Sequence, residues 1–226
     1  MYKLSERLKV IAGLVPEAAS VADIGADHGY LSIFIEKTKS PKRIIAADIN
    51  EKPLLSAKRN IEKTGAKSIE TRLSDGLAKI QPDEVDTVII AGMGGEVISG
   101  IIDRAEWLKD SRYTLLLQPM TSATNLRRYL AENGFDIVYE QAVKDAGKIY
   151  SVIKAQFVGE LKSFDEAFFH IGKLNAQNEL DREYIKKQLK IAKECKEQLQ
   201  NVGEAKEKYA FYKNLTEKIE GILGEV

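Results

Sequence analysis

The stretch that most constrains the fold is VADIGADHGY at residues 21–30. It opens as a short apolar strand over 21–24, breaks into a glycine-bearing turn over 25–29, and restarts at Tyr30 with helical apolar spacing. Open α/β sheets build nucleotide pockets in this way, because glycine lets the backbone approach a ligand and the first helical N–H groups lack partners inside the helix. The stretch predicts the first unit of a parallel sheet with a ligand at its edge.

This turn departs from the dinucleotide fingerprint G-x-G-x-x-G, since Ala26 and Asp27 stand where its second glycine would fall. Gly25 and Gly29 alone are equally compatible with a tight structural turn. Asp48 favours the interpretation of this turn as part of a ligand site. It ends a second buried-strand run about 20 residues later, where an acid can accept both hydroxyls of a ribose.

Composition narrows the class of protein. The 226 residues suit one domain with an appendage or two small domains, and 44% hydrophobic with 30% charged residues excludes a disordered chain. No apolar run approaches the roughly 20 residues that cross a bilayer, and the first residues are too charged for a signal peptide. The single cysteine, Cys195, and two histidines disfavour disulfides and metal sites. We expect a cytoplasmic protein without a metal ion or a membrane partner.

Strand and helix patterns alternate along the first 159 residues. Predicted strands lie at 21–24, 43–47, 69–73, 87–91 and 113–117, and predicted helices at 4–13, 30–38, about 53–64, 96–104 and 122–133. Two β-rich runs, 135–141 and 149–157, flank a short polar loop and predict an antiparallel hairpin. Five strand–helix units followed by this hairpin predict an α/β fold, a mostly parallel Rossmann-like sheet with helices on both faces.

The pattern changes after Gly159, where charged residues interleave with sparse apolar ones. Apolar residues between 164 and 199 recur at spacings of three and four, which predicts one long helix of roughly 50 Å. We expect a break near 201–203 and a second helix over about 205–222, giving an α-helical hairpin. The sequence therefore predicts two domains, 1–159 and 160–226.

Polar clusters follow the predicted strands at the edge where ligands bind in parallel sheets. They are Asp23–Gly29, Asp48–Asn50, Ser74–Gly76, Gly92–Gly95 and Gln118–Pro119. A structural sheet needs turns at these points, but not five turns rich in Asp, Gly and Asn. We therefore predict a ligand site at this edge.

The order of the clusters indicates S-adenosylmethionine as the cofactor. The first turn can face its methionine and ribose parts, Asp48 its ribose hydroxyls, and Asp75 the exocyclic amine of its adenine. Glycines after the fourth strand would line the side where the methyl group leaves. The candidate cofactor-binding residues are Asp23, Gly25, Ala26, Gly29, Tyr30, Asp48, Ile49, Asp75, Gly76, Ala91, Gly92, Met93 and Gly94.

The sequence resembles the bacterial tRNA (adenine-22-N1)-methyltransferase family over its whole length. The motifs that carry the resemblance are VADIGADHGYL (21–31), AADIN (46–50), SDGL (74–77), AGMGGE (91–96) and LLLQP (115–119). The resemblance implies a class I methyltransferase sheet with a C-terminal coiled coil, S-adenosyl-L-methionine as cofactor, and tRNA as substrate. The family has asparagine after Gln-Pro where this chain has Met120, so no substrate contact is assigned to position 120.

Three residues are candidates for the catalytic step, each beside a structural alternative. Asp27 could stabilise the cationic product ring or cap the following helix. His28 could contact the cofactor or target base, or hold the turn by hydrogen bonds. Gln118 could bind the amine edge of a flipped base or cap its strand. Adenine N-1 has an in-plane lone pair, so methylation requires in-line approach of an unstacked base and no general base.

Basic residues supply two candidate contacts with tRNA. Lys186, Lys187, Lys190, Lys193 and Lys196 lie mostly on one side of a predicted helix, although such runs are usually solvated faces. Lys3, Arg7 and Lys9 form the second candidate. We expect a monomer that binds tRNA, although zero net charge counts mildly against a nucleic-acid binder.

Other functions stay open at this point. The missing second glycine disfavours a nucleotide-dependent oxidoreductase. A non-catalytic RNA-binding or scaffold protein would use the helical hairpin alone. A class I methyltransferase acting on another RNA, a small molecule or a protein is compatible with the neutral charge.

Overall fold

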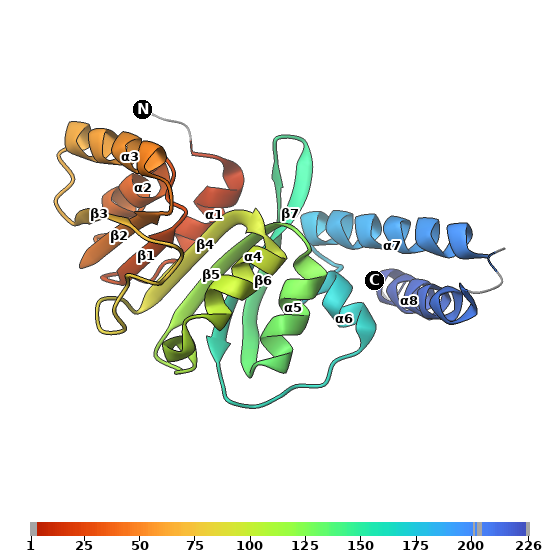
Figure 1. Cartoon of the computed structure of the whole chain (residues 1–226). Coiled ribbons are helices and arrows are strands. Elements are labelled where there is room, and N and C mark those ends of the chain that lie inside the picture. The colour runs from red at the N-terminus through yellow and green to blue at the C-terminus, as the bar shows by residue number, and fades with distance from the viewer. Residues whose placement is uncertain (1–3, 201, 203–204, 225–226) are drawn as a thin grey trace.

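Seven strands form one sheet in the order β3-β2-β1-β4-β5-β7-β6 (Figure 1). The computed structural model describes residues 4–200, 202 and 205–224. The first five strands are parallel, and β7 runs antiparallel to both β5 and β6, which confirms the predicted sheet and hairpin. The strands are β1 (Ser20–Ile24), β2 (Arg43–Asp48), β3 (Ile69–Leu73), β4 (Thr87–Gly94), β5 (Thr114–Thr121), β6 (Phe135–Asp145) and β7 (Lys148–Phe157).

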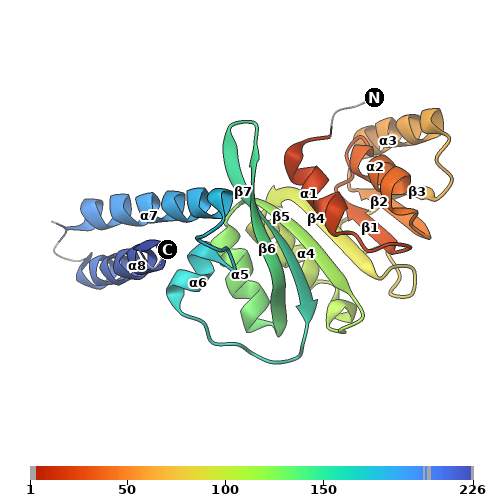
Figure 2. The same cartoon turned by 180° about the vertical axis from the view of Figure 1, so that it is seen from behind.

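Helices cover both faces of the sheet because successive side chains of a buried strand point to opposite sides. Ile89 of β4 packs in one cluster with α1 (Glu6–Leu14) and α2 (Tyr30–Lys39). Its neighbour Ile90 packs in the other, with α4 (Gly95–Asp103) and α5 (Ala123–Glu132). Figures 1 and 2 show these two layers from opposite sides, with α3 (Glu51–Thr64) beside α2.

The prediction of five strand–helix units is wrong at β3. Residues 74–86, all of them described, form turns and no α-helix. The Ser74 hydroxyl donates to the Gly76 carbonyl (2.9 Å) and accepts from the Lys79 N–H (3.1 Å), so side-chain bonds satisfy this backbone locally. A short 3-10 helix, η1 (Glu106–Leu108), follows α4.

Strands β4 and β5 run further than predicted, through the glycines and the proline expected to end them. Two register shifts lie between Ala91 and Gly94. Gly92 has φ +81°, a conformation that favours glycine, and Pro119 pairs in register with Met93 beside a shift. The glycine run is therefore a bulged strand end, a feature common next to active sites.

The long helix predicted after residue 164 is wrong in length. The structure has α6 (Glu166–Ile171) and then α7 (Glu179–Leu199), whose 21 residues span about 32 Å. Gly172 has φ +69° and ends α6, and the Asn178 side chain accepts the N–H groups of Leu180 and Asp181 and so begins α7.

Helix α8 (Lys206–Gly224) returns beside α7 (Figure 1). Ile185 and Ala192 of α7 pack with Leu215 and Ile219 of α8 in one buried cluster. Of the predicted break at 201–203, residues 201 and 203 lie outside the described residues.

Arg127 of α5 joins the sheet to the C-terminal helices. Its fully buried guanidinium pairs with Glu140 of β6 at 2.7 Å and donates to the Ser151 hydroxyl and the Tyr184 hydroxyl, each at 3.2 Å. It also donates to the carbonyl groups of Phe169 and His170 in α6, at 2.9 and 3.0 Å. Burial alone would lower the pKa of Arg127, but the carboxylate of Glu140 keeps it raised. One buried ion therefore binds five elements together.

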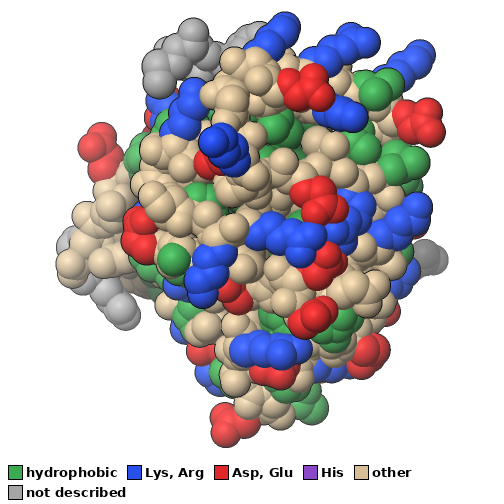
Figure 3. Space-filling model, turned by 90° about the vertical axis from the view of Figure 1, so that its left-hand side faces the viewer, with side chains coloured by type: hydrophobic (Ala, Val, Ile, Leu, Met, Phe, Trp, Pro, Cys, Tyr) green, Lys and Arg blue, Asp and Glu red, His purple; other side chains and the backbone are tan. Residues whose placement is uncertain are grey.

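The opposite end of the molecule, at β3 and α3, carries acidic and basic side chains intermixed (Figure 3). Arg72 pairs with Glu84 and Glu70, each at 2.5 Å, and Arg43 pairs with Glu84 at 3.1 Å. Hydrogen bonding to Arg72 lowers the pKa of Glu84 to about 2. Charges of this kind protect an edge strand from pairing with another chain.

Candidate active site

A cavity of about 420 Å³ opens at the carboxyl ends of β1, β2, β3 and β4. These ends meet at one edge because the strands are parallel. Ligands of open parallel sheets bind at this edge. The predicted residues that line the cavity are Gly25, Asp27, Asp48, Ile49, Asp75, Gly76, Ala91, Gly92 and Met93. Four of the five polar clusters singled out in the sequence therefore contribute to one cavity.

The turn after β1 is held in a shape that requires glycine. The N–H groups of Gly25 and Ala26 donate to the Ala47 carbonyl of β2 at 2.8 and 2.9 Å, which fixes the turn on the neighbouring strand. Gly25 has φ +76°, and a Cβ atom there would lie 2.3 Å from Cε of Met93. The positive φ therefore favours glycine at this turn, and the end of the Met93 side chain occupies the space next to it.

Asp48 is buried at the end of β2, with 8% of its surface exposed. One carboxylate oxygen accepts the Asn50 N–H at 2.8 Å, and the other accepts the Asp27 N–H at 3.2 Å. A carboxylate has about four lone-pair positions, so two remain for donors from a ligand. The fold therefore points a fixed acceptor pair at the cavity.

Asp23 is buried on β1, the strand next to β2, and lines a smaller cavity of about 210 Å³. This cavity adjoins the larger one, since Gly25, Asp27, Ala91 and Gly92 line both. The Ser32 hydroxyl donates to Asp23 at 2.6 Å. Burial raises the pKa of Asp23 to about 6, even though the hydrogen bond from Ser32 acts to lower it.

Residues 4–153 match a family model described as a methyltransferase domain. Over 231 aligned residues the chain is 32% identical to the tRNA (adenine(22)-N(1))-methyltransferase of Bacillus subtilis, and the alignment covers 99% of this chain and 97% of the relative. The chain belongs to the tRNA (adenine(22)-N(1))-methyltransferase family. This agrees with the family that the sequence motifs indicated.

Solved structures extend the similarity to the whole fold. The m1A22 tRNA methyltransferase TrmK of B. subtilis superposes with a TM-score of 0.87 at 29% identity, covering 99% of this chain and all of the other. TrmK of M. capricolum, solved with S-adenosyl-homocysteine, superposes with a TM-score of 0.80 at 27% identity, covering 99% of both chains. Coverage of this extent includes the C-terminal helices, so the methyltransferase-family likeness is not confined to the sheet.

In this methyltransferase-family chain, Asp27 and His28 lie together at the first turn. Asp27 lines both cavities and has φ +49°, and its side chain is largely exposed. The His28 ring lies 3.6 Å from the Asp27 carboxylate and stacks on Tyr30, with ring centroids 5.5 Å apart. The His28 carbonyl accepts a hydrogen bond from Asn60 of α3. Both residues are accessible from the smaller cavity.

Gln118 is completely buried and lines neither of the two cavities. Its side-chain oxygen accepts from Arg7 at 2.8 Å, and its side-chain nitrogen donates to the Pro119 carbonyl at 2.9 Å. Arg7 also pairs with Asp145 at 3.2 Å, lines the smaller cavity, and has its guanidinium next to Gly92. The structure therefore gives Arg7, which the sequence suggested only for tRNA contact, a place at this site.

The remaining predicted residues divide into two groups. Ala26 and Tyr30 line the smaller cavity, whereas Gly29 and Gly94 line neither. Gly29 packs against Ala57 of α3, where a Cβ atom would lie 3.2 Å from the Ala57 methyl group. Sequence reasoning gave no role to Arg104, which lines the larger cavity and lies 3.4 Å from the exposed carboxylate of Asp75. Its only sequence signal is its place at the end of the helix that follows the glycine run.

In the described ranges, no group of three or more His, Cys, Asp or Glu side chains is arranged to hold a metal ion. Across the same part of the chain, no helix is both long enough and apolar enough to cross a membrane.

Proposed function

We propose that this protein transfers a methyl group from S-adenosyl-L-methionine to ring nitrogen 1 of an adenine in tRNA, at position 22. The observation that carries the proposal is the cavity at the strand ends. It combines a glycine turn, a buried carboxylate and a glycine-rich strand end in a chain similar along its length to tRNA (adenine(22)-N(1))-methyltransferases.

The residues present fit this cofactor. We assign Asp48 to the ribose hydroxyls, because it keeps free lone pairs although it is buried. Ile49, Met93 and Ile101 supply apolar walls for the adenine and the sulfur-bound carbons, and Asp75 lies at the rim as an acceptor for the exocyclic amine. Asp23 in the adjoining cavity is the acid we assign to the cofactor's ammonium group.

The bound cofactor supplies an electrophilic methyl group on a sulfonium sulfur. Because adenine N-1 already carries a lone pair, the chain needs to hold an extruded base in line and exclude competing orientations. The methylated ring is cationic until it loses a proton. We assign Asp27, which is exposed and lines both cavities, to stabilise that charge, with His28 beside it to orient the carboxylate.

Gln118 enters the proposal as a positioning residue. Its amide is occupied at both ends by Arg7 and by the Pro119 carbonyl, so it acts on the site through these neighbours. In this arrangement Gln118 fixes the guanidinium of Arg7 against Gly92 at the wall that both cavities share.

The test uses unmodified tRNA transcripts and methyl-labelled cofactor. Nucleoside analysis should give 1-methyladenosine, and reverse transcription should stop next to position 22 because the methyl group blocks the base-pairing edge. A transcript with guanine at position 22 is the matched control and should stay unlabelled. Label in another nucleoside, or methyl transfer only to a small molecule or a protein, would contradict the proposal.

We also propose a division of labour in which 1–159 holds the cofactor and 160–226 binds tRNA, in a monomeric, cytoplasmic enzyme. Lys186 and Lys190 are exposed on α7 and supply positive charge for phosphates. Replacing both by Glu should raise the KM for tRNA about 10-fold or more and flatten its salt dependence, with cofactor affinity unchanged. Lys58→Glu with Lys63→Glu makes the same charge change on α3, at the other end of the molecule (Figure 1), and should have little effect.

A further inference from the structure

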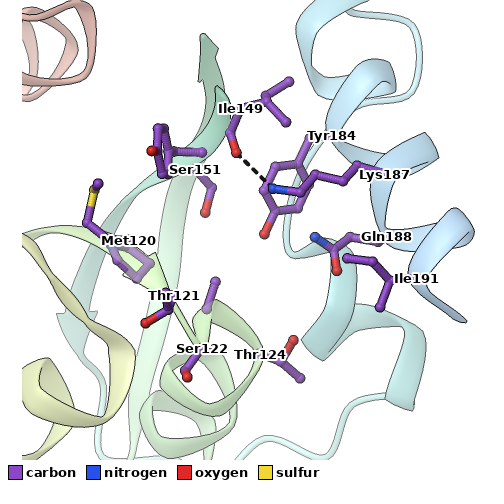
Figure 4. Close-up of a pocket in the computed structure, with 13 residues that line it drawn as sticks. Met120, Thr121, Ser122, Thr124, Ile149, Ser151, Tyr184, Lys187, Gln188 and Ile191 are labelled. Carbon is purple, nitrogen blue, oxygen red and sulfur yellow. Dashed lines mark hydrogen bonds between the residues drawn. The ribbon is translucent and has the colours of Figure 1, made fainter. Parts of the chain in front are cut away.

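A second groove lies between the start of α5 and helix α7, outside the cavities described above. Its volume is about 290 Å³. Figure 4 shows Gln188 and Ile191 of α7 on one side of the groove and Thr121, Ser122 and Thr124 on the other, while Lys187 extends toward the Ile149 carbonyl of β7. The sheet and the C-terminal helices build this groove jointly, and neither part forms it alone.

The groove is lined by neutral polar side chains and one lysine, so it is suited to a polar or negatively charged ligand. Among the described residues that line it, Lys187 alone is charged. Its ammonium group donates to the Ile149 carbonyl at 3.3 Å and keeps two further N–H donors. The side chains of Thr121, Ser122, Thr124 and Gln188 form no hydrogen bond with any other described residue. Tyr150, Met120 and Ile191 add apolar surface. These groups can bind a ligand that has both polar and apolar surface.

The groove shares a wall with the candidate active site. Gly92 and Met93 line the larger cavity, and the next two residues touch the floor of the groove. A Cβ atom on Gly94 would lie 3.2 Å from the Thr121 hydroxyl, and one on Gly95 would lie 2.2 Å from the Ser122 carbonyl oxygen. Only the thickness of two paired strand ends therefore separates the two spaces.

We propose that this groove holds a nucleotide that flanks the target adenine in the RNA. The inference rests on the proposed function and adds a second contact point for the same substrate. An enzyme that extrudes one base must also hold the neighbouring nucleotides, and contacts to them set sequence preference. Its volume of about 290 Å³ lies just below the roughly 300–1,000 Å³ found for ligand pockets, which suits a single nucleotide and excludes a duplex.

Two tryptophan variants of α7 test whether the groove is occupied. Gln188→Trp fills the groove without changing charge, and Gln198→Trp makes the same change at an exposed position ten residues further along α7. Gln188→Trp should lower kcat/KM for tRNA about 10-fold, the loss that one base contact of ordinary strength causes, and leave cofactor affinity unchanged. Gln198→Trp should match the unaltered chain. Thr124→Val, which removes one hydroxyl at nearly constant volume, serves if Gln188→Trp does not fold.

Substrates lacking one base make the test specific to the flanking nucleotide. We would prepare tRNA with an abasic residue immediately 5′ or 3′ of the methylated adenine. With one of these two abasic tRNAs, kcat/KM of the unaltered chain should fall about 10-fold. The same tRNA should cause no further fall in the Gln188→Trp chain, because its groove is already filled. Equal losses in both chains for both substrates would overturn the inference alone. Absence of any tRNA methylation by the unaltered chain would overturn the proposed function, and this inference with it.

Discussion

At the scale of single residues, two buried carboxyl groups of the candidate site are held in different ways. Asp48 accepts two backbone N–H groups, and Asp23 accepts one hydroxyl in a fully buried position. Donors toward a carboxylate favour its charged form, and burial disfavours it. For Asp23 the effect of burial is the larger one, so its pKa is raised.

Replacing Asp48 by Ala should weaken cofactor binding about 10-fold or more, because buried hydroxyl donors would lose their acceptor. Isothermal titration calorimetry measures the affinity, and Asp83→Ala, at an exposed turn, is the control with the same substitution. The N–H of Asp27 also loses a partner in the Asp48 variant, so its folding is checked first. Unchanged affinity in a folded Asp48→Ala chain would refute the ribose assignment.

Asp23→Asn should stabilise the protein in a pH-dependent way. Burial raises the pKa of Asp23 from its ordinary value of 3.8 to about 6, so the neutral carboxyl is favoured in the fold. The stability that this preference provides is present below pH 4 and is lost as pH rises toward 6. The gain in unfolding free energy from Asn should therefore grow between pH 4 and pH 6 and level off at up to about 3 kcal/mol.

Urea denaturation of the cofactor-free protein at several pH values measures this gain. Ser32→Ala provides the complementary control, because the Ser32 hydroxyl lowers the pKa of Asp23 and its removal extends the loss of stability to higher pH. A gain from Asn that is constant across the pH range would contradict the prediction.

The sequence could place Asp48 at the edge of the sheet, because this position follows from a local pattern, a buried strand that ends in an acid. The surroundings of Gln118 could not be predicted in this way. Its partner Arg7 lies 111 residues earlier, and α1 must fold onto the sheet before the two meet. Residue types and spacing predict which side chains lie at the strand ends, whereas long-range packing decides which of them remain available to a ligand.

At the scale of secondary-structure elements, the strand end of β4 and the start of α4 form the wall between the candidate active site and the groove beside α7. Gly95→Ala should destabilise the protein by about 1–3 kcal/mol and abolish turnover, since the new methyl group would overlap the Ser122 carbonyl oxygen. Gly100→Ala is the matched control on the same helix. Its nearest neighbour would be an arginine side-chain end at 3.7 Å, so it should be neutral or stabilising by up to about 1 kcal/mol.

Thermal unfolding and methyl-transfer assays on both variants check this prediction. Similar melting temperatures for the Gly95 and Gly100 variants would show that the backbone at Ser122 can move aside. In that case the close contact would not be what keeps the wall in place.

Predictions of elements succeeded where the pattern is repeated and failed where one residue overrides it. The apolar strand cores and the hairpin follow from alternation that several residues share. The long C-terminal helix was wrong because Gly172 adopts a positive φ against Glu140, a contact 32 residues away in sequence. Apolar spacing continues through this point and gives no sign of it. Asn178, whose side chain accepts two backbone N–H groups, is the residue that starts the next helix.

At the scale of the whole molecule, the buried Arg127 side chain links the sheet to helices α6 and α7. Glu140→Ala should lower the unfolding free energy by about 3–5 kcal/mol, because it leaves a buried guanidinium without its counter-ion. Replacing both residues by Met should recover most of this loss. Glu183→Ala breaks an exposed pair with Lys144 that also joins β6 to α7, and should cost at most about 1 kcal/mol.

Chemical denaturation of the four proteins measures these differences. Equal losses for Glu140→Ala and Glu183→Ala would show that Arg127 finds solvent or other acceptors. The same network bears on truncation. A fragment of residues 1–159 would lack four of the groups packed around Arg127 and Ala142, so the division of labour is better tested by charge reversal in the full chain.

The order in which a ribosome makes the chain gives the Arg127 network a further consequence. β7 lies between β5 and β6, so the sheet has a gap until residue 157 has been synthesised. The hydrogen bonds of Arg127 form later still, because its acceptors in α6 and on α7 follow it by 42 to 57 residues. Domains generally fold from the N-terminus during synthesis, so the strand ends of the candidate site can form early. The other end of the same sheet is completed only after residue 184 has been synthesised.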